Sequence, residues 1–478
     1  MKIKGFCELP RRLLMIKGGK RNIRISAEGE RICVSWKKYC VLLLLLICGS
    51  LMMSGCVAVQ SQQAALVPPA VLEFESSIMC RGCHGKIVEQ HEESMHAKSF
   101  SNPVFQAQYF LELLPQLPRH QDLRKDADKC IACHDPIAYI KNKGHIASPQ
   151  QTTQNLSGIV CDFCHRISAY SGDWPQSGNF IATPGESKFG PFKHASDRHH
   201  AYHELQTKSE FCGICHNDVN HEGVEIKSTY TEWKESAYAR KKIHCQDCHM
   251  NLQGFLTDNK PVFDSGQAAS MTLGPNYKRN KLYTHKFPGA HAKTQTADAL
   301  LLELSIDNAE SSPGEDVALN VHIVNKKVGH SMPSGSADLR MLWVELAANI
   351  DGRMIVIPAE PGKDAYDVAG RGMFDKEIIA GDVPEGSRLY RSIYLDRNGK
   401  QTLSSYNAAR IAFDNRLKAE ELRKEKYQFR IPKDARGTVI FTARINYLRY
   451  PSSFARSLGI EKTEPVELAV AKKEIRIR

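Results

Sequence analysis

The pattern of hydrophobic and polar positions divides the 478-residue chain into three stretches. Near its start, an unbroken apolar run extends from Tyr39 to Met53. Residues 76 to 297 are expected to form short helices and loops. One helix is expected from Tyr230 to Lys241, where Trp233 and Ala237 lie four residues apart on one face. The third stretch follows, and in it the period changes.

From Ala299 onward, apolar and polar residues alternate in short segments separated by Gly, Pro, Asn and Asp, which predicts a β-sandwich. The expected strands are Val317–Val324, Arg388–Leu395, Tyr427–Ile431, Val439–Tyr447 and Val466–Val470. The predicted fold class is therefore α+β multidomain, with a mainly helical and loop domain at residues 76–297 and an all-β sandwich domain at residues 298–478. The sandwich carries no catalytic constellation, so a structural cap or spacer is favoured over ligand binding.

The apolar run near the start has the length of a signal-peptide core and is short for a membrane span. Lys37 and Lys38 precede it, and it ends in Met53-Ser54-Gly55-Cys56, which resembles the lipobox of bacterial lipoproteins. We expect residues 1–55 to be a leader, Cys56 to be lipidated, and residues 56–75 to form a flexible tether. An uncleaved anchor helix is the alternative, and both place the protein at a membrane.

The formal net charge of +11 belongs mostly to this leader. Residues 1–55 hold eleven Lys and Arg against three Glu, a net charge of +8, which leaves +3 for the rest of the chain. Nucleic acid is therefore excluded as a partner.

Ten of the 15 cysteines form five Cys-x-x-Cys-His motifs, and the other five lie at or before Cys56. In such a motif two thiols form thioethers with haem vinyl groups, and the adjacent histidine binds the iron. The cysteine pairs are Cys80 and Cys83, Cys130 and Cys133, Cys161 and Cys164, Cys212 and Cys215, and Cys245 and Cys248, and the histidines are His84, His134, His165, His216 and His249. We expect five covalently bound c-type haems.

Paired Cys-x-x-Cys can also build a zinc ribbon or a redox dithiol, but neither needs a histidine directly after every pair. The first cysteines are 50, 31, 51 and 33 residues apart, an alternation that hints at haems arranged in couples.

The sixth iron position decides between an electron carrier and a catalyst. Fourteen histidines lie outside the motifs, so bis-histidine ligation and low reduction potentials are expected. The candidate ligands are His96, His200, His285, His291 and His330. His199 or His203 could replace His200, and His244 is disfavoured because it adjoins Cys245. The remaining reserves are His91, His120, His145, His194 and His221.

Three segments carry a family resemblance. Glu232–Tyr238, Cys245–Met250 and His285–Gly289 resemble multihaem cytochromes related to the tetrahaem cytochrome c of ammonia oxidisers, and the Gly329–Gly335 loop is similar to one in β-domains attached to them. The resemblance covers about residues 76–478. The wider superfamily includes pentahaem nitrite reductase and octahaem hydroxylamine oxidoreductase. Those nitrite reductases usually bind the catalytic haem through Cys-x-x-Cys-Lys, so five motifs ending in histidine count against nitrite reduction.

We therefore expect an exported, membrane-anchored electron carrier at the periplasmic or cell-surface face, with redox proteins as donor and acceptor. The second hypothesis is an oxidoreductase in which one open haem binds a small nitrogen or sulfur compound, with Tyr238, His221 or Lys241 lining its pocket. The third is an assembly role, in which the β-domain docks to a partner through an exposed apolar patch.

Overall fold

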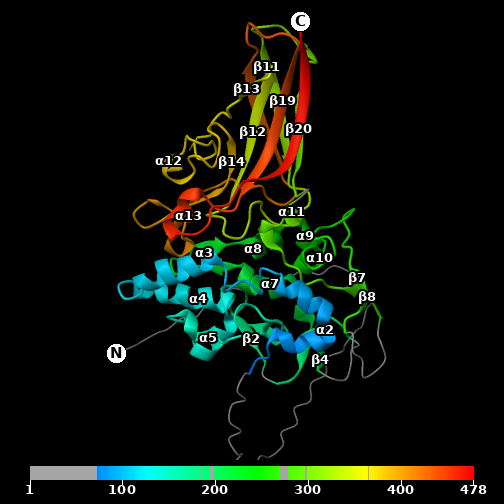
Figure 1. Cartoon of the computed structure of the whole chain (residues 1–478), viewed down its shortest axis with the longest axis vertical. Coiled ribbons are helices and arrows are strands. Elements are labelled where there is room, and N and C mark those ends of the chain that lie inside the picture. Colours follow the sequence, from blue (N-terminus) through cyan, green and yellow to red (C-terminus); the bar gives the residue numbers. More distant parts are fainter. Residues whose placement is uncertain (1–72, 184, 194–198, 270–277, 297–298, 364) are drawn as a thin grey trace, which may run out of the picture. The chain divides into compact units, whose positions relative to one another are not determined.

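The computed structural model describes residues 73–478 except 184, 194–198, 270–277, 297–298 and 364. The expected leader, most of the tether and Cys56 lie outside the described residues. The described residues belong to one compact unit. In it, short helices gather around the haem motifs and long strands follow them (Figure 1). The α+β architecture expected from the sequence is confirmed, and the boundary at residue 298 stays a prediction.

Short helices separated by loops and small hairpins make up the motif region. Most contain or precede a Cys-x-x-Cys-His segment, and side-chain hydrogen bonds to the backbone hold some of the loops between them. The helices are α2 (Ser77–Glu92), α3 (Pro103–Gln106), α4 (Arg124–His134), α5 (Pro136–Asn142), α6 (Cys161–Cys164), α7 (Ser209–His216), α8 (Thr229–Glu235), α9 (Ala237–Arg240), α10 (Cys245–His249) and α11 (Lys293–Thr296), with a π-helix at Ala107–Leu113. The hairpins pair β1 (Ile167–Tyr170) with β2 (Phe180–Ala182), β5 (Asp218–Val219) with β6 (Glu225–Lys227), and β7 (Asp264–Gln267) with β8 (Lys278–Leu282), while β3 (Lys188–Gly190) and β4 (His200–Tyr202) pair in parallel.

The single helix predicted from Tyr230 to Lys241 is wrong in one respect, because the backbone is extended at Ser236. The Ser236 hydroxyl donates to the carbonyl of Trp233 and accepts from the backbone N–H of Tyr238. It therefore ends α8 and caps α9, as serine does at helix termini.

Two larger sheets and one small sheet form the β-region. In the first, β11 lies between β9 and β18; in the second the order is β10-β20-β19-β12-β13, and β14 also pairs with β12. A third small sheet has the order β16-β15-β17. The bounds are β9 (Leu301–Ile306), β10 (Glu310–Ser311), β11 (Asp316–Val324), β12 (Met341–Ile350), β13 (Arg353–Val356), β14 (Arg388–Tyr390), β15 (Ser392–Leu395), β16 (Gln401–Thr402), β17 (Arg410–Asp414), β18 (Leu422–Arg430), β19 (Thr438–Leu448) and β20 (Val466–Ile477), with short helices α12 (Asp375–Ile378) and α13 (Ser452–Leu458) in the connections.

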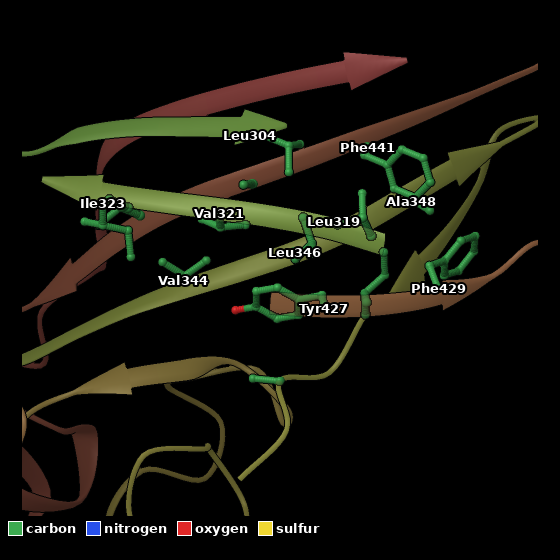
Figure 2. Close-up of a cluster of buried hydrophobic side chains, with 14 of the residues drawn as sticks. Leu304, Leu319, Val321, Ile323, Val344, Leu346, Ala348, Tyr427, Phe429 and Phe441 are labelled. Atoms are coloured by element: carbon green, nitrogen blue, oxygen red, sulfur yellow. The ribbon is translucent and has the colours of Figure 1, made fainter. Parts of the chain in front are cut away.

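The core of the β-region lies between the two larger sheets. Alternate residues of β11, such as Leu319 and Ile323, face Val344 and Leu346 of β12 (Figure 2). Successive side chains of a strand point to opposite faces, so buried and partly exposed residues alternate along β11. This alternation is the pattern from which the sequence predicted the strand.

Shortening Ile323 is expected to weaken this core. Its side chain is fully buried, so Ile323→Val removes one methylene from close packing and should lower the free energy of unfolding by about 1 kcal/mol. Guanidinium titration followed by far-ultraviolet circular dichroism measures the change. Ile440→Val is the matched control, because Ile440 is 39% exposed. Equal effects of the two variants would contradict the packing described.

Candidate haem sites

Each Cys-x-x-Cys-His motif occupies one turn of helix. The pair Cys161 and Cys164 bounds α6, and α4, α7 and α10 end at His134, His216 and His249. In α2 the motif lies inside the helix, and the backbone leaves helical geometry at His84. Because residues three apart share one face of a helix, both thiols of a motif point to the same side. The motif histidine comes directly after the second cysteine.

Four motif histidines each have a second imidazole opposite them. The ring centroids are 6.1 to 6.4 Å apart, and the second ring comes from a distant part of the chain. The facing pairs are His84 with His199, His216 with His96, His165 with His285, and His249 with His330.

This spacing fits two imidazoles on opposite sides of one iron. With metal–nitrogen bonds of about 2 Å, the centres of two axial rings lie about 6 Å apart. Rings in direct van der Waals stacking would lie closer, as Phe105 and His134 do at 4.1 Å. The motif residues therefore fit a haem between each facing pair.

Hydrogen bonds to backbone carbonyls hold several of these imidazoles through Nδ1. Nδ1 of His84 lies 2.7 Å from the carbonyl of Ala268, and Nδ1 of His165 lies 2.6 Å from that of Phe189. The same nitrogen of His330 lies 2.9 Å from the carbonyl of Ser331. A carbonyl can only accept, so Nδ1 carries the proton and Nε2 keeps the lone pair that binds a metal.

Burial favours the neutral, ligating form of several of these imidazoles by lowering their pKa. It lowers the pKa of His96 and of His285 to about 3, and that of His249 and of His134 to about 4. It also lowers the pKa of His216, and the charges of neighbouring groups act in the same direction. Neutral imidazole is the form that coordinates iron, so the interior suits the haem ligands expected from the sequence.

Thiols of different motifs lie side by side. The thiols of Cys80 and Cys161 interact, so the first motif lies beside the third. Cys133 and Cys215 join the second to the fourth in the same way. The fourth also meets the fifth through Cys212 and Cys245. The fourth motif is therefore central among the five.

The second motif differs from the others. Nδ1 of His134 lies 2.9 Å from the carbonyl of Ser99, and Phe105 stacks on its ring. Among the side chains that the structure describes, no imidazole stands opposite His134. Lys227 lies near this motif, 3.8 Å from Asp218; burial would lower its pKa, but Asp218 and the neighbouring thiols raise it.

The predicted distal ligands fall into two groups. The structure brings His96, His285 and His330 opposite motif histidines, whereas the side chains of His200 and His291 lie outside its described part. The ring that faces His84 belongs to His199, the neighbour of the predicted His200. Nothing in the dipeptide His199-His200 separates the two, so the sequence could find the position only to within one residue.

Other histidines have different partners. His221 lies 2.6 Å from Asp126 through Nδ1 and 3.3 Å from Asp122 through Nε2. His91 contacts the carbonyl of Ile159 through Nε2, and His145 contacts Asp128. Only His221 among these three has contacts at both ring nitrogens, whereas Nδ1 of His91 is buried without a hydrogen-bond partner among the described residues and the contact of His145 is made by its Nδ1.

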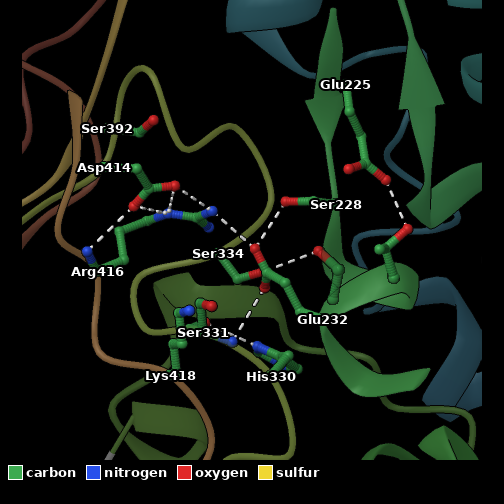
Figure 3. Close-up of polar contacts among 12 residues, drawn as sticks. Glu225, Ser228, Glu232, His330, Ser331, Ser334, Ser392, Asp414, Arg416 and Lys418 are labelled. Atoms are coloured by element: carbon green, nitrogen blue, oxygen red, sulfur yellow. Dashed lines mark hydrogen bonds and ion pairs between the residues drawn. The ribbon is translucent and has the colours of Figure 1, made fainter. Parts of the chain in front are cut away.

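The loop that carries His330 is fixed by a polar cluster that sequence analysis missed. Glu232 of α8 lies between Ser331 and Arg416 (Figure 3). The only sequence signal was the pattern Gly-His-x-x-Pro-x-Gly at Gly329–Gly335, which marks the loop and says nothing of what anchors it.

Comparison with known proteins bears on the whole arrangement. Residues 79–166, which include the first three motifs, match the family model described as cytochrome c554 and c-prime. No curated protein matches the chain significantly. The family match over residues 79–166 and the motif sites support a multihaem c-type cytochrome.

Within this class, the chain is similar to the penta-heme cytochrome c552 from Thermochromatium tepidum. The two share 19% sequence identity, with a TM-score of 0.56 over 84% of this chain and 99% of that chain. The reeler domain of human F-spondin matches with a TM-score of 0.17, at 12% identity over 38% of this chain and 89% of that chain. The CARDB domain of the PF1109 protein from Pyrococcus furiosus also has a TM-score of 0.17, at 9% identity over 37% of this chain and 87% of that chain. Likenesses that weak carry no argument about the β-region.

Proposed function

We propose that this chain is an exported pentahaem c-type cytochrome that passes single electrons between redox partner proteins. The observation that carries the proposal is the set of four imidazole pairs with ring centroids 6.1 to 6.4 Å apart. Two histidines on one iron leave no position for a substrate. That property suits a carrier rather than a catalyst.

The five haems would supply the one-electron chemistry, and the protein residues hold them. The ten motif cysteines provide the covalent links, and the motif histidines provide one ligand each. His96, His199, His285 and His330 are proposed as the opposite ligands. Backbone carbonyls such as that of Phe189 fix the ligand orientation through Nδ1. Contacts between thiols of different motifs keep neighbouring haems close, which favours rapid electron exchange.

The cellular setting belongs to the same proposal. Haem attachment to Cys-x-x-Cys-His takes place outside the cytoplasm, and the apolar run with Cys56 supports export and lipid anchoring at a membrane. Among residues described in the structure, no helix combines the length and apolar character that a membrane crossing requires. A respiratory-chain donor and a periplasmic or cell-surface acceptor are the proposed partners.

A second candidate function rests on His134. Its ring contacts Phe105, and no described imidazole faces it, so an iron bound there would offer a position to an external ligand. Lys227 and Asp218 nearby would give that position a polar lining. The candidate is an oxidoreductase in which this haem acts on a small nitrogen or sulfur compound.

Electron paramagnetic resonance of the oxidised, haem-loaded protein separates the two candidates. The carrier proposal expects low-spin signals from the four facing pairs and a spectrum that nitrite and hydroxylamine leave unchanged. A high-spin signal that shifts on addition, and that disappears in a Cys130→Ala/Cys133→Ala variant, would establish the second candidate. The same substitutions at Cys80 and Cys83 serve as the control.

A further inference from the structure

The loop between β11 and β12 crosses from the β-region to the fifth motif. It places the ring of His330 opposite that of His249, with centroids 6.4 Å apart and planes within 10° of parallel. Tyr238 of α9 packs beside the loop, and its hydroxyl donates to the carbonyl of Lys326 at 2.7 Å. Contacts with the β-region on one side and with the motif region on the other hold this loop in place.

On the β side, Asn325 and Arg416 hold the loop. The Asn325 amide donates to the carbonyls of His330 at 2.9 Å and Leu417 at 3.0 Å. Arg416 donates to the carbonyl of Pro333 at 3.2 Å and pairs with Asp414 at 2.8 Å. These contacts fix the loop to its own sheet but do not touch the motif region.

On the motif side, Glu232 of α8 makes the connection, and both of its carboxylate oxygens are used. Oε1 accepts from the Ser228 hydroxyl at 2.7 Å and pairs with Arg416 at 2.7 Å. Oε2 accepts from the backbone N–H of Ser331 at 3.0 Å, directly after His330 (Figure 3). The side chains of Glu232 and Arg416 are only 14% and 8% exposed, so water competes little for these bonds.

Helix α8 is itself tied to the fifth motif. The indole of Trp233, next to Glu232, donates to the carbonyl of Ile243 at 2.8 Å, two residues before Cys245. A Ser334 hydroxyl 2.7 Å from that of Thr229 adds a second link between the loop and α8. The part of the chain from α8 to the fifth motif carries His249, one proposed ligand of the fifth haem. The same part therefore also holds the loop that carries His330, the other proposed ligand.

We propose that Glu232 is a positioning residue for the fifth haem: by holding Ser331 and Arg416 together, it keeps His330 in the sixth ligand position opposite His249. The inference rests on the proposed bis-histidine ligation of that haem. It gives the β-region a direct part in a redox site, because the ligand and Arg416 both come from its strands and loops. The structural cap expected from the sequence is then only part of its role.

The test compares three variants of the haem-loaded protein. Glu232→Gln keeps the size of the side chain but leaves one acceptor oxygen for two sites, so either Ser331 or Arg416 loses its partner. His330→Ala removes the ligand itself. Glu420→Gln is the matched control, because the Glu420 carboxylate pairs with Lys241 across the same two regions at 2.8 Å and is 42% exposed. Glu420 reaches Asn325 through its backbone N–H, which the substitution keeps.

Carbon monoxide binding to the reduced protein and electron paramagnetic resonance of the oxidised protein report the sixth position without any activity assay. His330→Ala should bind one more equivalent of carbon monoxide than the wild type and gain one high-spin iron. Glu232→Gln should bind part of this additional equivalent, because losing one charge-assisted hydrogen bond raises the population of the open loop about tenfold. Glu420→Gln should match the wild type.

The outcomes distinguish a failure of the proposed ligation from a failure of the proposed role of Glu232. If His330→Ala changes neither signal, the proposed ligation of the fifth haem is wrong. If His330→Ala opens the site but Glu232→Gln behaves like Glu420→Gln, the ligation stands and the positioning role of Glu232 is overturned. If Glu232→Gln is unstable to purification, Ser228→Ala, which removes one donor to the same carboxylate, carries the test with the same expected direction.

Discussion

Replacing both Cys212 and Cys215 with alanine is expected to remove one haem and to reduce the amount of folded protein severalfold. These thiols lie beside Cys245 and Cys133, so the fourth site adjoins two others. A haem bound there would fill the centre of the motif region, where short helices leave few apolar side chains to replace it. Haem content per protein by the pyridine assay, intact mass, and yield of soluble protein measure the effect.

The matched control is Cys80→Ala/Cys83→Ala at the first motif. Cys80 lies beside a thiol of one other motif, that of Cys161. This variant should also lose one haem but retain most of its yield. A fourth-motif variant that still carries five haems would show that Cys212 and Cys215 do not bind one, and equal yields of the two variants would contradict the central place of the fourth motif.

The sequence predicted the parts of the fold that have a local signal. Strand β11 was expected at Val317–Val324 and is found at Asp316–Val324, because one of its faces is buried and the other is partly exposed. The motifs were visible for a similar reason, since the porphyrin fixes the spacing of two thiols and a histidine. His330 was selected as a candidate ligand through the loop pattern that surrounds it, and the structure places its ring opposite that of His249.

Other parts had no such signal. Strand β12 (Met341–Ile350) was not predicted, because Val344 faces one cluster of buried side chains and Trp343 faces another, which removes the alternation. The pairing of histidines was equally hidden. His96 faces His216 across 120 residues of sequence, and only the folded chain brings them together. The spacing of the motifs hinted at couples but did not give their members.

Arg391 shows a third kind of miss. The single strand predicted at Arg388–Leu395 is broken there into β14 and β15, which belong to different sheets. The side chain of Arg391 turns inward and pairs with Asp375 of α12 at 2.8 Å, with side-chain exposures of only 2% and 3%. The alternation of apolar and polar residues gives no sign that a charged side chain within such a segment is buried.

Removing Asp375 is expected to destabilise the β-region more than any single apolar truncation proposed above. Asp375→Ala leaves the Arg391 guanidinium buried without its counter-charge, and the backbone N–H groups of Gly370 and Gly372, each 3.0 Å from the same carboxylate, lose their acceptor. Breaking a buried pair in this way costs about 3–5 kcal/mol. Guanidinium titration of the haem-loaded protein followed by circular dichroism measures the loss.

Two controls separate the charge effect from simple truncation. Arg353→Ala breaks the pair with Asp434, whose side chains are 55% and 67% exposed, and should change the free energy of unfolding by less than about 1 kcal/mol. The double variant Asp375→Leu/Arg391→Met removes both buried charges and should recover much of the loss, because the cost arises from an uncompensated charge rather than from the missing attraction. A double variant as unstable as Asp375→Ala would instead assign the cost to the lost hydrogen bonds of Gly370 and Gly372.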